Sequence, residues 1–240
     1  MEYFNSDCSV CKRLGKLLRE DSEVSEYYNA NYISYAMNTY NELPAQEHAF
    51  LKNAHLNFNS VPVLLYFDKD KKFLHYSTPE INAEFIISEG KKALFPAFNA
   101  AGLKSKYEAG DRTVRTLYAF SSFLVIQENT QLLNKVTQEL YDSFRKGELP
   151  TKKSYIILKN VVQSSDNGFF QYWINNLSGL TGFESGIKSG TEFSYLQTIV
   201  LKEVSDPNSK NWDEAKKNKY KEYIVKLKMS ENPDVFFEIL

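Results

Sequence analysis

The chain contains two cysteines, and they stand three residues apart in the stretch Cys8-Ser9-Val10-Cys11. At the beginning of a helix, residues three apart occupy neighbouring positions of the first turn, so the two sulfurs can bond to each other or act on one substrate. A disulfide across so short a loop would do little to stabilise a chain of 240 residues. The spacing therefore favours redox chemistry over a structural crosslink.

Thiol–disulfide exchange requires a thiolate, and a free cysteine, with a pKa of about 8.5, is mostly protonated at neutral pH. A helix N-terminus presents unpaired N–H groups and the positive end of the helix dipole, which lower the pKa of a sulfur placed there. Lys12 and Arg13 add positive charge, whereas Asp7 opposes it. We expect Cys8, nearer the open end, to attack the substrate and Cys11 to resolve the mixed disulfide.

Two cysteines at this spacing are also half of a zinc or copper site. The other candidate ligands are three histidines, His48, His55 and His75. His48 and His55 are seven residues apart on one expected helix, and no second cysteine pair accompanies them. We therefore expect all three histidines at the surface or at the boundary of the core, and neither a metal site nor a cofactor.

The charges of the chain nearly cancel, with 29 Lys and Arg against 30 Asp and Glu, for a net charge of −1. This balance favours neither nucleic acid nor an anionic membrane surface as a partner. No apolar run approaches the roughly 20 residues of a membrane-spanning helix, so we expect no membrane span. The hydrophobic share of 42% is enough to build a sizeable core.

Hydrophobic patterning in the first half alternates between helices and strands. After Cys11, leucines repeat at helical spacing, and this helix is expected to end near Asn29. Residues 61–67 form a continuous apolar run, which is typical of a strand covered on both faces. The remaining expected elements are a strand over 32–37 with Ile33, Tyr35 and Met37 on one face, a helix over 43–56, a strand over 72–77 and a helix over 79–95.

The segment 96–111 is rich in Ala, Gly and polar residues and is expected to be a linker. It separates an expected domain over 1–95 from an α-helical domain over 112–240, in which no strand is expected. Its aromatic residues, including Phe169, Phe170 and Trp173, are expected to form the core of that domain. Helices are expected from Asp111 to about Val125 and over 130–146, 151–164, 169–177, 192–204 and 212–229.

The order strand, Cys-x-x-Cys, helix, strand, helix, Val-Pro, strand, strand, helix resembles the thioredoxin superfamily over residues 1–95. Three features carry the resemblance: Cys8-Ser9-Val10-Cys11-Lys12 at the start of the first helix, Ser60-Val61-Pro62 before an apolar strand, and the hairpin over 67–73. The resemblance implies an α/β thioredoxin-like domain, with a central mixed sheet flanked by helices, followed here by an all-α helical domain.

The resemblance also implies roles for individual residues. In many thioredoxins a buried acid lies six residues before the first cysteine, a position that Glu2 occupies here, and it would exchange a proton with the second cysteine. Pro62 would be cis, which leaves the backbone of Val61 free to pair with an extended substrate. The chain departs from the family pattern at Asp7, where a tryptophan is usual, and at Ser9-Val10, which replaces Gly-Pro. The family's redox potential is therefore not carried over.

The strand before the motif is central in this fold, and only a few residues precede Cys8, so we expect that strand to be short or incomplete. We expect a thiol–disulfide oxidoreductase that acts on protein thiols or disulfides, with a redox partner protein and with the helical domain docking a partner. The alternative is a redox-silent binding module on a thioredoxin-like scaffold. The resemblance favours a periplasmic or otherwise extracytoplasmic location and leaves a cytoplasmic one open.

Overall fold

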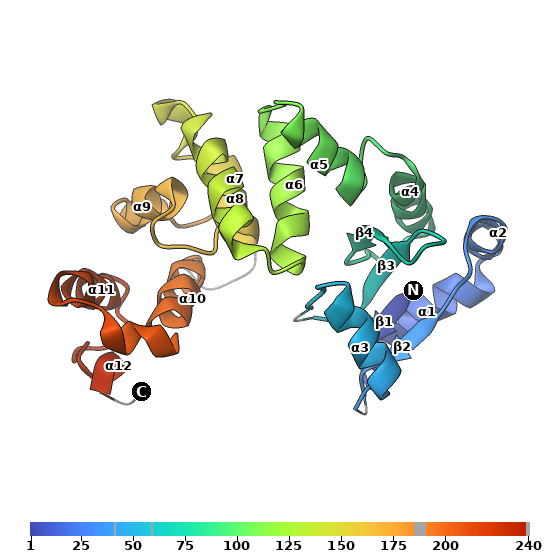
Figure 1. Cartoon of the computed structure of the whole chain (residues 1–240), viewed down its shortest axis with the longest axis horizontal. Coiled ribbons are helices and arrows are strands. Elements are labelled where there is room, and N and C mark those ends of the chain that lie inside the picture. Colours follow the sequence, from blue (N-terminus) through green and yellow to red (C-terminus); the bar gives the residue numbers. More distant parts are fainter. Residues whose placement is uncertain (41, 59, 185–190, 239–240) are drawn as a thin grey trace. The chain divides into compact units, whose positions relative to one another are not determined.

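The computed structural model of the chain describes residues 1–40, 42–58, 60–184 and 191–238 (Figure 1). The chain divides into two compact units. The first consists of Met1–Asp111 together with Phe123–Asn129, and the second of Arg112–Ser122 together with Thr130–Leu240. The coarse expectation of an α/β part followed by a helical part agrees with the elements that these units contain.

The first unit is built on a four-stranded mixed sheet with the strand order β2-β1-β3-β4. Its strands are β1 (Glu2–Phe4), β2 (Ala36–Asn38), β3 (Val63–Phe67) and β4 (Phe73–Ser77). β1 runs parallel to β2 and antiparallel to β3, and β3 and β4 form an antiparallel hairpin. The strand that leads to the cysteine motif is therefore an inner strand of three residues.

In the described part of the first unit, five complete helices accompany this sheet, and the cysteine motif opens the first of them. They are α1 (Ser9–Glu20), α2 (Ser22–Asn31), α3 (Ala45–Asn53), α4 (Ala83–Leu94) and α5 (Ala100–Glu108). The single helix expected from Cys11 to Asn29 is two helices, because the Asp21 side chain accepts the N–H of Val24 and starts α2 as its N-cap.

The core on one face of the sheet is made by α1, α2, α4 and the inner strand β3. Its buried members are Leu14, Val24, Tyr28, Leu64, Tyr66, Ile86 and Ala93. Buried hydroxyl groups need partners, and here the hydroxyls of Tyr28 and Tyr66 lie 2.7 Å apart. The Tyr28 hydroxyl also donates to the backbone oxygen of Ile86 at 2.8 Å, which ties α2 to α4.

The expected strand over 32–37 is wrong in its first half, since the strand begins only at Ala36. Met37 is buried as expected, but Ile33 is 99% exposed and Tyr35 is 51% exposed. The reason lies in Tyr32, which ends α2 as its C-cap and donates its hydroxyl to the backbone oxygen of Gly90 at 2.6 Å. The chain therefore turns away from the core before it pairs with β1.

The segment 96–111, which was expected to be a linker, contains the helix α5 and belongs to the first unit. The Asn99 side chain caps α5, and Leu103 and Tyr107 are buried. The segment is rich in polar and small residues, and its overall composition does not show that α5 has one apolar face. Composition alone therefore indicated a linker.

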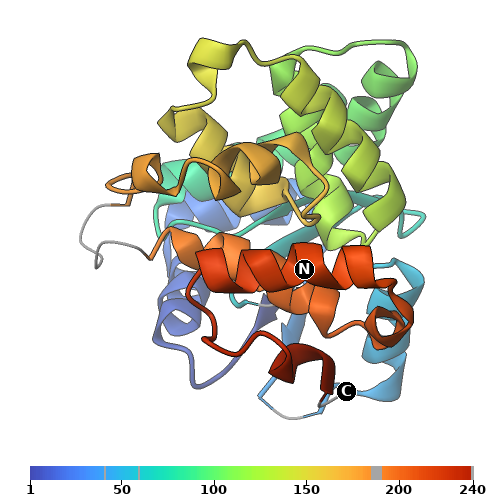
Figure 2. The same cartoon turned by 90° about the vertical axis from the view of Figure 1, so that its left-hand side faces the viewer.

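The second unit is helical: its described residues, 112–122, 130–184 and 191–238, contain helices and turns and no strand. Its α-helices are α6 (Val114–Ile126, shared with the first unit), α7 (Thr130–Asp142), α8 (Lys152–Val161), α9 (Gly168–Ile174), α10 (Phe193–Val204), α11 (Glu214–Lys226) and α12 (Val235–Glu238). Helices α10 and α11 lie side by side (Figures 1 and 2).

Aromatic side chains form the core of the second unit, as expected. Phe169, Phe170 and Trp173 are fully buried in α9, and the Trp173 indole N–H donates to the Ser154 hydroxyl at 3.0 Å. Over the part of the chain that the structure describes, every helix is too short or too polar to cross a membrane.

Candidate functional site

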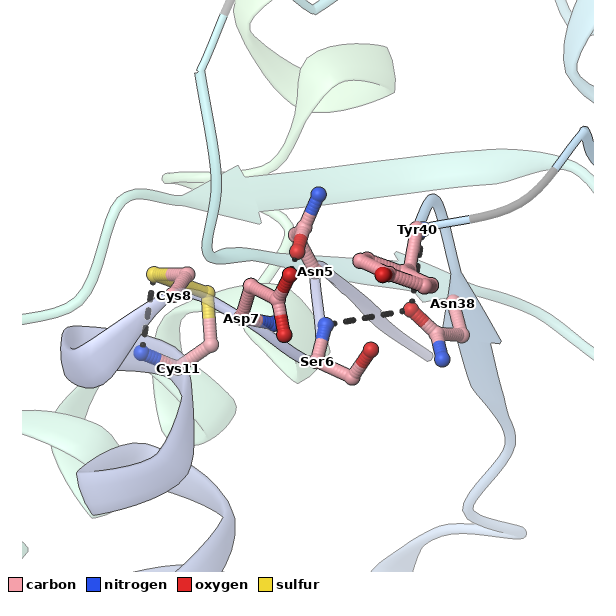
Figure 3. The surroundings of a disulfide bond; sticks show 7 residues. All are labelled: Asn5, Ser6, Asp7, Cys8, Cys11, Asn38 and Tyr40. Atoms are coloured by element: carbon pink, nitrogen blue, oxygen red, sulfur yellow. Dashed lines mark hydrogen bonds between the residues drawn. A yellow bond between two sulfur atoms is a disulfide. The ribbon is translucent and has the colours of Figure 1, made fainter.

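Cys8 and Cys11 form a disulfide at the N-terminus of α1 (Figure 3). Cys8 is the N-cap residue and Cys11 lies in the first turn, with 5.2 Å between their Cα atoms. Cys8 is partly exposed, whereas Cys11 is only 2% exposed. The sulfur that an incoming substrate can reach is therefore that of Cys8.

The sulfur of Cys8 occupies the position of a helix-capping acceptor. Its Sγ accepts a hydrogen bond from the backbone N–H of Cys11 at 3.1 Å, and the Cys8 carbonyl accepts the N–H of Lys12 at 3.1 Å. Anionic acceptors are favoured at this position by the unpaired N–H groups and by the helix dipole. In the reduced protein the same N–H would stabilise a Cys8 thiolate, with the exposed Lys12 and Arg13 adding positive charge.

The loop before the motif is held by two asparagine side chains (Figure 3). Asn5 closes a turn, because its side chain accepts the N–H of Asp7 at 2.8 Å and its carbonyl accepts the N–H of Cys8 at 3.1 Å. Asn38, at the end of β2, accepts the N–H of Ser6 at 3.2 Å through its Oδ1. These bonds fix the path of the chain from β1 into the N-cap.

Asn38 also connects this loop to the segment that follows β2. The same Oδ1 accepts the backbone N–H of Tyr40 at 3.0 Å, and the Thr39 N–H donates to the Phe4 carbonyl at 2.7 Å. One carboxamide oxygen therefore holds two backbone segments at the carboxyl end of the parallel pair β1–β2. Tyr40 is 55% exposed beside them.

Pro62 lies at the same end of the sheet as the cysteine pair. β3 runs antiparallel to β1, with Val63 opposite Tyr3, so the beginning of β3 meets the end of β1 that leads to Cys8. The Val61–Pro62 peptide bond is cis, Pro62 is buried and Val61 is partly exposed. In the described chain, neither the N–H nor the C=O of Val61 has a hydrogen-bond partner.

Glu2 lies on β1 directly opposite Leu64, and therefore faces the core that α1 and α2 cover. Burial raises the pKa of Glu2, and the positive charges of Arg19 and of the Met1 amine oppose that rise. Among the described residues the structure records no hydrogen bond between Glu2 and either cysteine. The sheet thus brings Cys8, Cys11 and Pro62 to one end, and places Glu2 behind them on the strand that carries the motif.

The histidines do not converge on the cysteines. His48 and His55 are exposed, as expected, but the expectation for His75 is wrong because it is only 8% exposed. Its Nε2 lies 2.9 Å from Glu89 Oε2, and this buried pair joins β4 to α4. Among the described residues no three His, Cys, Asp or Glu side chains are grouped so that they could hold a metal ion.

Three residues of this region were missed by the sequence reasoning: Asn5, Asn38 and Arg19. An asparagine followed two residues later by an aspartate is a turn signal and could have identified Asn5. The contacts of Asn38 depend on the pairing of β1 with β2, and those of Arg19 on the path of its side chain along α1. Neither the strand pairing nor the path of the side chain can be inferred from the local sequence.

No family model, no curated protein and no solved structure matches the chain.

Proposed function

We propose that the protein is a thiol–disulfide oxidoreductase with a thioredoxin-like first unit. The observation that carries the proposal is the hydrogen bond from the Cys11 N–H to the Cys8 sulfur at a helix N-terminus. It supplies the stabilisation that a thiolate nucleophile needs, on the one sulfur of the pair that is partly exposed. The mixed sheet, in which the motif follows an inner strand paired in parallel with β2, supports the same assignment.

In the reducing direction, the Cys8 thiolate attacks one sulfur of a substrate disulfide. A bond forms between Cys8 Sγ and that sulfur, and the second substrate sulfur leaves as a thiolate that takes up a proton. Cys11 then loses its proton and attacks Cys8 Sγ, which forms the Cys8–Cys11 disulfide and releases the first substrate sulfur. Two electrons pass from the dithiol to the substrate, and a redox partner protein returns them. The oxidising direction is the reverse sequence.

The surroundings of the pair supply the other groups that exchange requires. The N–H and C=O of Val61, which have no partner among the described residues, are proposed to pair with an extended substrate segment next to Cys8, in the manner of an added strand. Glu2 is the carboxyl group proposed to take and return the proton of Cys11. Both cysteines lie in the first unit, so the role proposed for the helical second unit is to dock a partner protein.

Reduction of insulin by dithiothreitol, followed by turbidity, tests the proposal. The wild-type chain should accelerate the reaction, and Cys8→Ser should abolish the acceleration. Lys146→Gln, which changes an exposed residue in the second unit, serves as the matched surface control. Full activity in Cys8→Ser would refute the assignment. A wild-type chain that never accelerates exchange and whose thiols never cycle would instead favour a redox-silent binding module.

The location of the protein is part of the same proposal. The resemblance of the first unit to the thioredoxin superfamily favours an extracytoplasmic protein, such as one of the periplasm, and this is the location we propose.

A further inference from the structure

A cavity of about 420 Å³ lies in the first unit beside β1. Ionisable side chains from several elements line it, among them Glu2, Arg19, Tyr28, Tyr35 and Tyr66. Neither cysteine belongs to its lining. The cavity therefore gives Glu2 access to solvent behind the cysteine motif, on the side of α1 that carries Arg19.

Arg19 reaches this cavity by folding back along α1. Cys11, Gly15 and Arg19 are spaced four residues apart, so they share one face of the helix. A Cβ atom on Gly15 would lie 3.1 Å from Nη1 and 3.3 Å from Nη2 of Arg19. The guanidinium group thus lies over the one position of this helix face that lacks a side chain.

Five charged or titratable groups line the cavity together with Glu2, and only one of them keeps a positive charge at every relevant pH. Burial raises the pKa of Tyr28 and of Tyr66, and the hydrogen bond to Glu47 raises that of Tyr35, so all three hydroxyls stay neutral.

The two positive groups are the Met1 amine, one residue before β1, and the Arg19 guanidinium on α1. Burial lowers the pKa of the Met1 amine to about 6, so that charge is lost above this pH. Arg19 remains charged throughout, because an arginine does not deprotonate in proteins.

We propose that Arg19, folded over Gly15, is a positioning residue that holds Glu2 as a carboxylate and so sets the pH range in which Glu2 can accept the proton of Cys11. This inference rests on the proposed function. When Cys11 attacks the mixed disulfide, its thiol proton passes to the Glu2 carboxylate, which the cavity connects to solvent. The S–S bond between Cys8 and the substrate breaks, and the leaving substrate sulfur takes the proton back. Without the guanidinium, burial keeps Glu2 protonated to higher pH and removes the acceptor.

The test is a carboxyl NMR titration of Glu2 in the full-length chain, in the wild type, Arg19→Gln and Arg19→Lys. We expect Arg19→Gln to move the Glu2 titration to higher pH and Arg19→Lys to leave most of the wild-type behaviour. Lys16→Gln is the matched control, since it removes an exposed cation from the same helix, where Lys16 pairs with Glu20. An unchanged Glu2 titration in Arg19→Gln would overturn the inference, whatever the redox activity.

A second measurement connects the charge of Arg19 to exchange. The mixed disulfide of Cys8 with a small aromatic thiol is formed, and its release by Cys11 is followed against pH. Arg19→Gln should slow release a few-fold near neutral pH, well below the factor of roughly 10² to 10⁴ that full acid–base catalysis contributes. When Arg19→Gln is added to Glu2→Gln, the rate of release should not fall further. Equal release profiles in wild type and Arg19→Gln would remove the catalytic part of the inference. If neither the wild type nor any variant releases the thiol, the proposed function is refuted. The NMR titration of Glu2 still tests the effect of Arg19 on Glu2 in that case.

Discussion

The sulfur of Cys8 accepts the backbone N–H of Cys11, with 3.1 Å between Sγ and N. This bond makes the two cysteines unequal, since the first receives the hydrogen bond at the helix N-terminus and the second is only 2% exposed. In the proposed reaction the same asymmetry separates the attacking sulfur from the resolving one.

Alkylation of single-cysteine variants measures this asymmetry. In Cys11→Ser the free Cys8 keeps the helix N-terminus and partial exposure, so it should react with iodoacetamide at pH 7 at least about tenfold faster than Cys11 does in Cys8→Ser. The rate is compared with that of glutathione under the same conditions. Equal rates in the two variants would show that the N-terminus of α1 does not distinguish the sulfurs.

Asn38→Ala should loosen the loop that leads to Cys8. The substitution removes the acceptor of the Ser6 and Tyr40 N–H groups, both at exposed positions, so we expect a loss of about 1 kcal/mol in the free energy of unfolding. Alkylation of Cys8 should slow as well, because the N-cap is less well held. Asn53→Ala is the control: Asn53 is also exposed, at the end of α3. Equal effects of the two variants on Cys8 would contradict the role given to Asn38.

The buried pair of Glu89 and His75 should give the stability of the protein a pH dependence. Burial by itself would raise the pKa of Glu89, but hydrogen bonds from His75 and Lys92 outweigh it and hold the pKa below its usual range. A carboxyl group with a depressed pKa stabilises the fold above its unfolded pKa of about 4.5, and this contribution is lost as the pH falls through the folded pKa.

Glu89→Gln should therefore cost about 2 kcal/mol at pH 7 and should flatten the decline of stability below about pH 4.5. Urea unfolding at a series of pH values gives both quantities. Glu84→Gln, at an exposed position in the first turn of the same helix, should keep the acid decline of the wild type. A Glu89→Gln curve parallel to that of the wild type would mean that the pair is not the source of the decline.

Gly102→Ala tests whether the segment 96–111 is packed. A Cβ at this position would lie 1.5 Å from the backbone oxygen of Pro96, so the start of α5 or the chain before it must move. We expect a loss of about 2 kcal/mol or more in the free energy of unfolding. Gly147→Ala should have little effect, because a Cβ there meets nothing within 4 Å. A neutral Gly102→Ala would show that the segment is a loose linker after all.

The sequence predicted the elements whose signals are local. The apolar run over 61–67 contains a strand of the sheet, and the hairpin expected over 67–73 joins it to the next strand. Asp68 indeed accepts the N–H groups of Asp70 and Lys72 within that turn. The predicted start of the helix at the cysteine pair was also correct, because Cys8 of the motif is itself the N-cap.

The errors arose where tertiary contacts decided the outcome. Ile33 and Tyr35 have the alternation of a strand, but the anchoring of Tyr32 to Gly90 turns that part of the chain outward. His75 was expected at the surface or at the boundary of the core, because nothing in the local sequence indicates its distant partner Glu89. In the candidate site, the cysteine pair and Pro62 could be identified from sequence, whereas the hydrogen bonds of Asn38 and the place of Arg19 beside the cavity depend on the folded chain.

The central claim is that the Cys8–Cys11 pair cycles between dithiol and disulfide, and its equilibrium with glutathione tests this most directly. The wild-type chain is equilibrated across ratios of reduced to oxidised glutathione, quenched with a thiol-blocking reagent and analysed by mass spectrometry. We predict a single reversible two-electron transition, with a midpoint that gives the reduction potential and with both thiols blocked together. A pair that stays in one redox state across the whole range would contradict the account.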